Sequence, residues 1–147
     1  MGQKKIVITS GYFNPIHAGH MNLLREAKQL GDFLVVIVNN DEQVKAKGST
    51  PFMSVEERMA IIKELKPVDA VFLSVDNDKP IAKSLRAVAE MYPGELYFAK
   101  GGDRSADNIP QSETETCQEY NITIGNGVGG GKVQSSSWLL KSIKQSS

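Results

Sequence analysis

Short runs of β-branched and aromatic residues alternate along the chain with segments whose apolar residues recur at helical spacing. The apolar runs predict strands at residues 6–9, 33–38, 70–75, 96–99 and 122–124. The helical spacing predicts helices that start near residues 20, 54, 80, 113 and 136. Two polar segments, residues 45–51 and the glycine-rich residues 125–131, predict a mobile loop and a flexible flap.

The order of these elements defines the expected fold class. A chain in which strands and helices alternate forms right-handed crossovers and a parallel sheet with helices on both faces. The unbroken apolar run at residues 33–38 fits this arrangement, since parallel strands are covered on both faces. With 147 residues and 40% hydrophobic content, the chain is expected to form a single α/β, Rossmann-like domain over residues 1–147. We expect its parallel sheet to contain about five strands.

Composition and charge exclude several classes of protein. The 17 Lys and Arg residues balance 17 Asp and Glu residues, so the clustered positive charge of a nucleic-acid binder is not expected. No apolar run approaches the roughly 20 residues that span a bilayer, and the first residues lack the pattern of a secretory leader. The single cysteine, Cys117, is expected to be a small buried side chain. We therefore expect a cytoplasmic protein with no membrane or nucleic-acid partner.

Both histidines of the chain lie in the segment after the first predicted strand. His17 and His20 are three residues apart at a predicted helix start, so they share one face of the helix. A helix N-terminus offers unpaired N–H groups and the positive end of a dipole, and two imidazoles beside it can clamp phosphate oxygens. Gly11 permits a tight turn there, and Gly19 keeps bulk away from the clamp. The alternatives are that His20 is an inert core residue or that the imidazoles bind zinc, which is disfavoured because too few ligands are nearby.

The segment Gly11–His20 resembles the HxGH signature of the nucleotidyltransferase superfamily, which contains cytidylyltransferases and adenylyltransferases. The resemblance covers nearly the whole chain and is strongest to heptose-phosphate adenylyltransferase domains and glycerol-phosphate cytidylyltransferases. Beyond the signature it rests on Asn39–Asp41, Lys45, Lys47, Gly48, Glu57–Met59, Val68–Val71 and Lys100–Asp103. The family's last motif corresponds to Ser135–Ser137 in this chain. The arginine that often precedes this motif in the family is absent here, and Lys132 is the nearest cation.

The resemblance also implies a role for individual residues. The catalytic residues it implies are His17, His20 and Lys47. The nucleotide-binding residues it implies are Gly11, Tyr12, Phe13, Asn14, Gly19, Lys100, Gly101, Asp103, Ser135, Ser136 and Ser137. The residues it implies for phosphate or acceptor binding are Lys45, Arg58 and Lys132.

Several of these residues also have ordinary structural explanations. Lys45 and Lys47 could be solvated charges, and Arg58 could pair with a helix neighbour. The glycines before Asp103 could form a plain turn, and Ser135–Ser137 could be only a helix N-cap.

The implied activity is transfer of a nucleoside monophosphate from CTP or ATP to a small phosphorylated acceptor, with release of pyrophosphate. The acceptor would be a sugar, polyol or amino-alcohol phosphate, Mg²⁺ would bridge phosphate oxygens, and the enzyme would be a homodimer. Two alternatives stay open from the residues: a non-catalytic nucleotide-binding module, and a flavodoxin-like interaction domain in which the histidines are structural.

Overall fold

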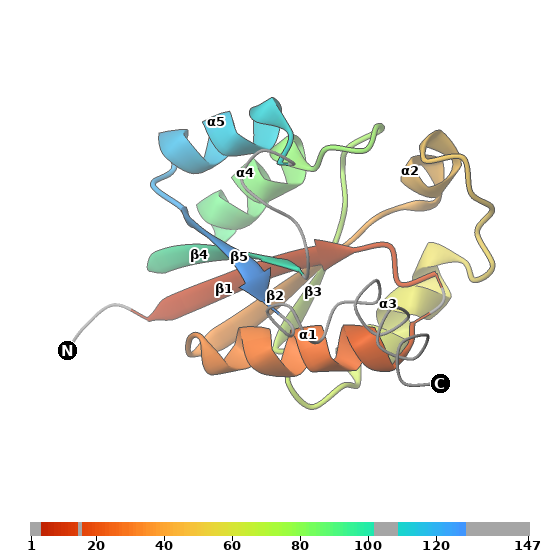
Figure 1. The fold of residues 1–147 in the computed structure, drawn as a ribbon, viewed down its shortest axis with the longest axis horizontal. Helices are drawn as coiled ribbons and strands as arrows, with labels where there is room; N and C mark the ends of the chain where they lie inside the picture. Colours follow the sequence, from red (N-terminus) through yellow and green to blue (C-terminus); the bar gives the residue numbers. More distant parts are fainter. Residues whose placement is uncertain (1–3, 15, 102–108, 129–147) are drawn as a thin grey trace, which may run out of the picture.

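The computed structural model describes residues 4–14, 16–101 and 109–128. Within them, five strands form one parallel sheet in the order β3-β2-β1-β4-β5 (Figure 1). The strands are β1 (Lys5–Gly11), β2 (Phe33–Val38), β3 (Ala70–Leu73), β4 (Glu95–Gly101) and β5 (Thr123–Val128). This all-parallel sheet confirms the α/β, Rossmann-like fold class that the alternating pattern predicted.

Helices cover both faces of the sheet, as expected of parallel strands joined by crossovers. Figure 1 shows α1 (Ala18–Gln29) and α3 (Val55–Lys63) on one face, and α4 (Ala82–Met91) and α5 (Gln111–Glu119) on the other. The short helix α2 (Asp41–Ala46) follows β2 directly and lies beyond the edge of the sheet where β2 ends. None of the helices among the described residues is long and apolar enough to cross a membrane.

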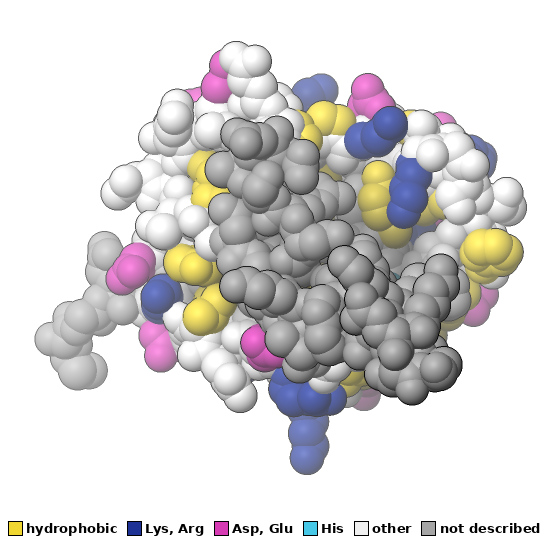
Figure 2. All heavy atoms as spheres, viewed as in Figure 1, with side chains coloured by type: hydrophobic (Ala, Val, Ile, Leu, Met, Phe, Trp, Pro, Cys, Tyr) yellow, Lys and Arg dark blue, Asp and Glu magenta, His cyan; other side chains and the backbone are white. Residues whose placement is uncertain are grey.

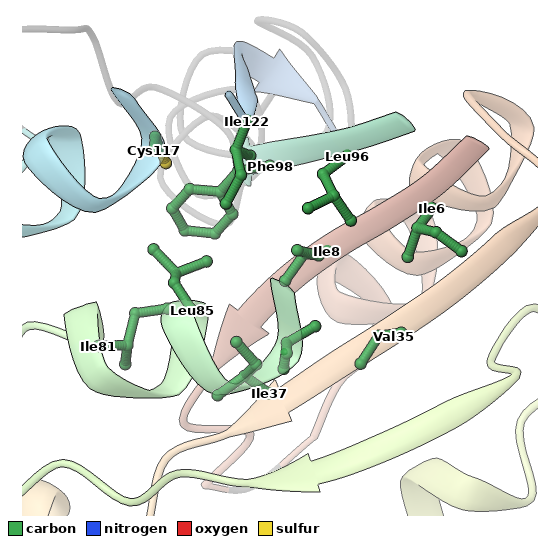
Figure 3. Packing of buried hydrophobic residues seen from close by; sticks show 11 residues of the cluster. Ile6, Ile8, Val35, Ile37, Ile81, Leu85, Leu96, Phe98, Cys117 and Ile122 are labelled. Atoms are coloured by element: carbon green, nitrogen blue, oxygen red, sulfur yellow. The ribbon is translucent and has the colours of Figure 1, made fainter. Parts of the chain in front are cut away.

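The side chains of each strand alternate between two cores. On the α4 and α5 face, Ile8 of β1 packs with Ile37, Leu85, Phe98 and Cys117, all of which are buried (Figure 3). On the α1 and α3 face, the alternate residues of the same strands form a second buried cluster. The burial of Cys117 agrees with the prediction that it is a small core side chain.

The strand order creates a switch point beside β1. From β1 the chain moves outward to β2 and β3, and it then returns to β4 on the other side of β1. In such sheets the crossover connections diverge at the carboxyl ends of the two central strands and leave a crevice there. The loop that follows β1 opens at this edge.

Helix α2 is the main difference from the sequence prediction, which gave a mobile loop from residue 45 to residue 51. Asn40 caps the helix by accepting a hydrogen bond from the Gln43 N–H, and the Gln43 side chain accepts one from the Asn40 N–H. The helix ends in a Schellman motif, in which Gly48 has a φ of +89°. A six-residue helix is too short for apolar periodicity to show, so its caps are its only sequence signal.

The predicted glycine-rich flap is also corrected in part. Residues 125–128 belong to β5, which pairs in parallel with β4. A Cβ at Gly125 would come within 1.8 Å of the Tyr97 hydroxyl oxygen, so glycine serves close packing here rather than mobility. Residues 129–131, and the helix predicted to start near residue 136, lie outside the described residues.

Two buried carboxylates from outside α4 bond to the N–H groups at its start. Asp76 accepts hydrogen bonds from the N–H groups of Lys83 and Ser84, and Glu113 accepts one from the N–H of Ile81. Neither acid lies in α4, and Ile81 itself, the N-cap, provides no side-chain bond. Strand β3 ends at Leu73, two residues earlier than the predicted strand at residues 70–75. The chain after Leu73 turns and places Asp76 at the start of α4.

Candidate functional site

A cleft of about 330 Å³ opens where the loop after β1 meets α1 and α2. Its volume is near the lower end of the range typical of small-molecule sites. The lining residues are Ser10, Gly11, Tyr12, Phe13, Asn14, His17, His20, Val44, Lys47 and Ser49. This list includes both histidines and excludes every carboxylate of the described residues.

The two histidines form a capping box at the N-terminus of α1. His17 is the N-cap, and its Nδ1 accepts a hydrogen bond of 3.1 Å from the Gly19 N–H. The Nδ1 of His20 accepts a bond of 3.0 Å from the His17 N–H. The two rings stack with their centroids 3.9 Å apart. The HxGH spacing therefore has a local structural cause, because residues N-cap and N3 of a helix are those that can cap each other.

This pattern of hydrogen bonds fixes the tautomer of both rings. A neutral imidazole has one donor nitrogen and one acceptor nitrogen. Since Nδ1 is the acceptor in both His17 and His20, the proton of each neutral ring is on Nε2. The pair is thus suited to donate hydrogen bonds from Nε2 to an anion.

The environment of His20 keeps this ring neutral. Its pKa is lowered to about 4, first by burial and then by the positive charges of His17 and Lys47. Phe13 contributes to the enclosure, because its ring meets the His20 ring edge to face at a centroid distance of 4.8 Å. Near pH 7, His20 is therefore a neutral donor rather than a cation.

The start of α1 provides an electropositive environment. The first turn of this 12-residue helix contains no acidic side chain. The positive end of the helix dipole favours an anion there. The buried residue Gly19, predicted to bind nucleotide, lies within this turn.

Lys47 brings a cation to the lining of the cleft. It is the C-cap of α2, and its Nζ lies 4.1 Å from the centroid of the Tyr12 ring. Figure 2 shows Lys and Arg side chains, in dark blue, gathered over the part of the surface where Figure 1 places α2. Lys45 is exposed, lies 3.9 Å from Glu42 and is absent from the lining.

Arg58 makes internal contacts and does not line the cleft, so the structure gives no support to the phosphate-binding role that the sequence suggested. Its side chain is fully buried, and its Nη2 donates to Asp41 Oδ1 at 2.6 Å. Its Nη1 donates to the carbonyls of Tyr12 and Asn39, each at 2.7 Å, and its Nε donates to the carbonyl of Met53. The guanidinium therefore links three backbone segments and stabilises their packing against one another.

Asn14 and Phe13 also use their side chains internally. The Asn14 amide donates to the Thr50 carbonyl at 2.8 Å and accepts from the Phe52 N–H at 2.8 Å. The Phe13 side chain is 1% exposed and belongs to the core cluster on the α1 face, with a φ of +50°. These two predicted nucleotide-binding residues line the cleft, and their side chains shape its wall.

The remaining predicted residues fall into three groups. Gly11 and Tyr12 line the cleft, whereas Lys100 and Gly101 are the last two residues of β4 rather than part of a turn after it. Asp103, Lys132, Ser135, Ser136 and Ser137 lie outside the described residues. Sequence reasoning missed the cleft residues Ser10, Val44 and Ser49; the Asn40–Gln43 capping signal would have placed Val44 on a helix facing the first loop.

The described part of the chain offers no ready-made metal site. It contains no group of three or more His, Cys, Asp and Glu side chains that could hold an ion. A divalent ion prefers oxygen ligands, and the described walls of the cleft offer neutral oxygens only.

Comparison with known proteins identifies a matching family and several relatives. A family model described as cytidylyltransferase-like matches residues 8–126. The bifunctional protein HldE of Actinobacillus succinogenes is 36% identical over 143 residues, which is 96% of this chain and 28% of that protein. The FAD synthase of Ferroglobus placidus is 47% identical over 81 residues, which is 54% of this chain and 53% of that protein. The chain thus spans about a quarter to about half of the length of these two curated relatives.

One solved structure is also similar over most of its length. It is a lipopolysaccharide core biosynthesis protein from Thermoplasma volcanium, with a TM-score of 0.66 and 29% sequence identity. The match covers 84% of this chain and 93% of that one.

Proposed function

This chain belongs to the cytidylyltransferase-like family, and from that premise we propose that it transfers a nucleoside monophosphate from a nucleoside triphosphate to a small phosphorylated acceptor. The observation that carries the proposal is the stacked pair of imidazoles at the N-terminus of α1, both with Nδ1 occupied and Nε2 protonated. A pair of Nε2–H donors at a helix N-terminus is suited to a phosphate chain.

The chemistry requires little beyond positioning and charge stabilisation. An oxygen of the acceptor phosphate attacks the α-phosphorus, the bond from the α-phosphorus to the bridging oxygen breaks, and pyrophosphate leaves. Since a phosphate monoester already carries most of its charge near pH 7, no general base is needed. The site must then align the two phosphates and stabilise the charge that develops on the transferred group.

The two histidines are suited to stabilise that charge. We assign their Nε2–H groups to oxygens of the α-phosphate and to the bridging oxygen that becomes part of pyrophosphate. A hydrogen bond to these oxygens strengthens as they gain charge, so it lowers the barrier more than it improves ground-state binding. Lys47 adds positive charge within the same cleft, and Lys45 and Lys132 are further candidates for phosphate contact.

Magnesium enters this proposal as part of the nucleotide. Because the described cleft walls carry no carboxylate, the phosphate oxygens of the magnesium nucleotide are its natural ligands. Further nucleotide binding is assigned to Lys100, Gly101, Asp103 and the hydroxyls of Ser135, Ser136 and Ser137, as the family resemblance implies.

The relatives support ATP as the donor. One of them is named FAD synthase, and FAD is a dinucleotide that contains AMP. The resemblance to glycerol-phosphate cytidylyltransferases keeps CTP as the alternative. The acceptors to be tested are therefore glycerol phosphate, a sugar phosphate, ethanolamine phosphate and flavin mononucleotide.

The test is pyrophosphate release with ATP or CTP and each acceptor. We predict that His20→Ala lowers kcat by about a hundredfold or more. Removal of one hydrogen-bond donor from an oxyanion hole has an effect of this size. The matched control is Lys63→Gln, which removes an exposed charge at the end of α3, and it should leave kcat unchanged. A normal kcat in His20→Ala would reject the proposed role.

The same assay separates the enzyme from a non-catalytic nucleotide-binding module. The absence of an arginine before Ser135 is the observation that favours such a module. A module would gain thermal stability with a nucleoside triphosphate. It would release no pyrophosphate with any acceptor, and that result would decide in its favour.

A further inference from the structure

The Tyr12 ring and the Lys47 ammonium meet inside the candidate cleft although they are far apart in sequence. Tyr12 directly follows β1, whereas Lys47 is the C-cap residue of α2. The Nζ lies 4.1 Å from the ring centroid, which is well inside the distance for a cation–π contact. The family resemblance assigned separate roles to these residues and gave no reason for them to touch.

The backbone of Lys47 is held in place by the end of its helix. The Gly48 N–H donates to the Lys45 carbonyl at 2.9 Å, and the Ser49 N–H donates to the Val44 carbonyl at 3.1 Å. These are the two bonds of a Schellman motif, and they place Lys47 at a fixed point on the rim of the cleft. Its four-carbon side chain is then the remaining source of freedom for the ammonium.

The backbone of Tyr12 is held from the opposite side. Its carbonyl accepts a hydrogen bond of 2.7 Å from the buried Arg58, which is itself paired with Asp41. Two residues later, the Asn14 amide is bonded to the segment that precedes α3. The ring therefore extends from a segment that is held by hydrogen bonds at Tyr12 and at Asn14.

Lys47 also lies close enough to the histidines to act on them. Its charge is one of the three causes of the lowered pKa of His20, after burial and the charge of His17. Lys47, His17 and His20 all line the same cleft. The ammonium on the tyrosine ring thus shares a cleft with the Nε2–H donors of the two histidines.

We propose that Tyr12 is a positioning residue, whose aromatic face holds the Lys47 ammonium beside His17 and His20 before phosphate arrives. The proposal rests on the proposed function, because phosphate is the anion that the three groups would share. A flexible lysine loses conformational freedom when it binds phosphate, and a ring that restrains the ammonium beforehand reduces that loss. The expected size of the effect is set by the cation–π contact and is about twofold to fivefold in affinity.

The first test needs no substrate. In the full-length protein, the side-chain methylene protons of Lys47 next to the ammonium should have NMR shifts moved upfield by the Tyr12 ring, with the signals assigned by their loss in Lys47→Gln. Tyr12→Phe should keep the upfield shift, and Tyr12→Leu should abolish it. Ordinary lysine shifts in the unmodified protein would refute the inference, whatever the protein catalyses.

The second test measures binding of inorganic pyrophosphate by calorimetry. Tyr12→Leu should weaken binding by about twofold to fivefold, and Tyr12→Phe should restore it to within about twofold. In the Lys47→Gln background, Tyr12→Leu should have no further effect, because a residue that acts through Lys47 cannot act without it. An equal loss in both backgrounds would show that Tyr12 acts by itself and would overturn the proposal.

Controls separate this inference from a failure to fold and from a failure of the proposed function. Tyr120→Leu removes the ring beneath Arg86, 5.7 Å away and outside the cleft lining, and should leave pyrophosphate binding unchanged. If Tyr12→Leu lowers the melting temperature, Tyr12→Gln repeats both tests with a side chain suited to a half-exposed position. Absence of pyrophosphate binding in the unmodified protein would contradict the proposed function, and the lysine shifts would still decide the inference.

Discussion

At the scale of single residues, the site depends on how His17 and His20 share their nitrogens. The helix start uses both Nδ1 atoms as caps, so the same bonds that stabilise α1 also set the donor nitrogens of the cleft. Structure and chemistry are therefore coupled in one turn of helix. Protonation of His20 on Nδ1 would break the hydrogen bond that this nitrogen accepts from the His17 N–H. The capping box at the start of α1 would then lose one of its two bonds.

The protonation of His20 gives a prediction at this scale. With a pKa of about 4, the ring stays neutral down to mildly acidic pH, and the unfolded chain binds its proton first as the pH falls below the ordinary histidine value. Stability should therefore start to fall as the pH drops through about 6.5 and should keep falling toward pH 4, whereas activity should change through His20 only as the pH approaches 4.

NMR titration of the His20 ring checks this prediction. Lys47→Gln should raise the pKa of His20, although not to the ordinary value, because burial is the first cause of the shift and persists. Lys45→Gln removes a charge from the same helix, where it lies beside Glu42, and serves as the matched control that should leave the pKa in place. An ordinary histidine pKa in the unmodified protein would contradict the enclosed position of the ring.

At the scale of elements, the short helix α2 connects the fold to the site. It is bounded by the Asn40 cap and by Gly48, and it delivers Lys47 to the cleft. Its apolar pattern is too short to recognise, and this is why residues 45–51 were predicted to be a loop. The longer helices were predicted because their apolar faces recur over several turns.

Gly48 gives a prediction for this element. Its φ of +89° strains any residue that has a Cβ, although a Cβ there would meet no atom within 4 Å. Gly48→Ala should therefore lower the free energy of unfolding by about 1 kcal/mol through the backbone alone. Gly48→Asn, which tolerates this conformation better, should lose less, as measured by urea unfolding. Equal losses in both variants would indicate that φ is not the cause.

At the scale of the whole molecule, the sequence predicted the sheet better than it predicted the site. The five strands follow from local apolar runs, and their alternation with helices leads to the parallel order. The fate of Arg58 has no local signal, because the carbonyls it binds belong to Tyr12, Asn39 and Met53, which only the folded chain brings together.

The distribution of charge is another property of the whole fold. The chain has a formal net charge of zero, yet the described lining of the cleft includes Lys47 and no carboxylate. The balanced composition argued against the clustered charge of a nucleic-acid binder, and it does not report this local arrangement because it averages over the whole chain. The sheet topology brings the histidines and Lys47 together. Strands β1 and β2 are parallel neighbours, so the loop after β1 and the helix after β2 lie at the same edge of the sheet.

The most direct test of the central claim is long-range ¹H–¹⁵N NMR of the two histidine rings at neutral pH, before and after addition of magnesium ATP. We predict that in both His17 and His20 the Nδ1 atom accepts a hydrogen bond and the Nε2 atom carries the proton, and that the Nε2 signals of both rings shift as the nucleotide binds. A proton on Nδ1 of either ring, or saturation by nucleotide that leaves both Nε2 signals unchanged, would contradict it.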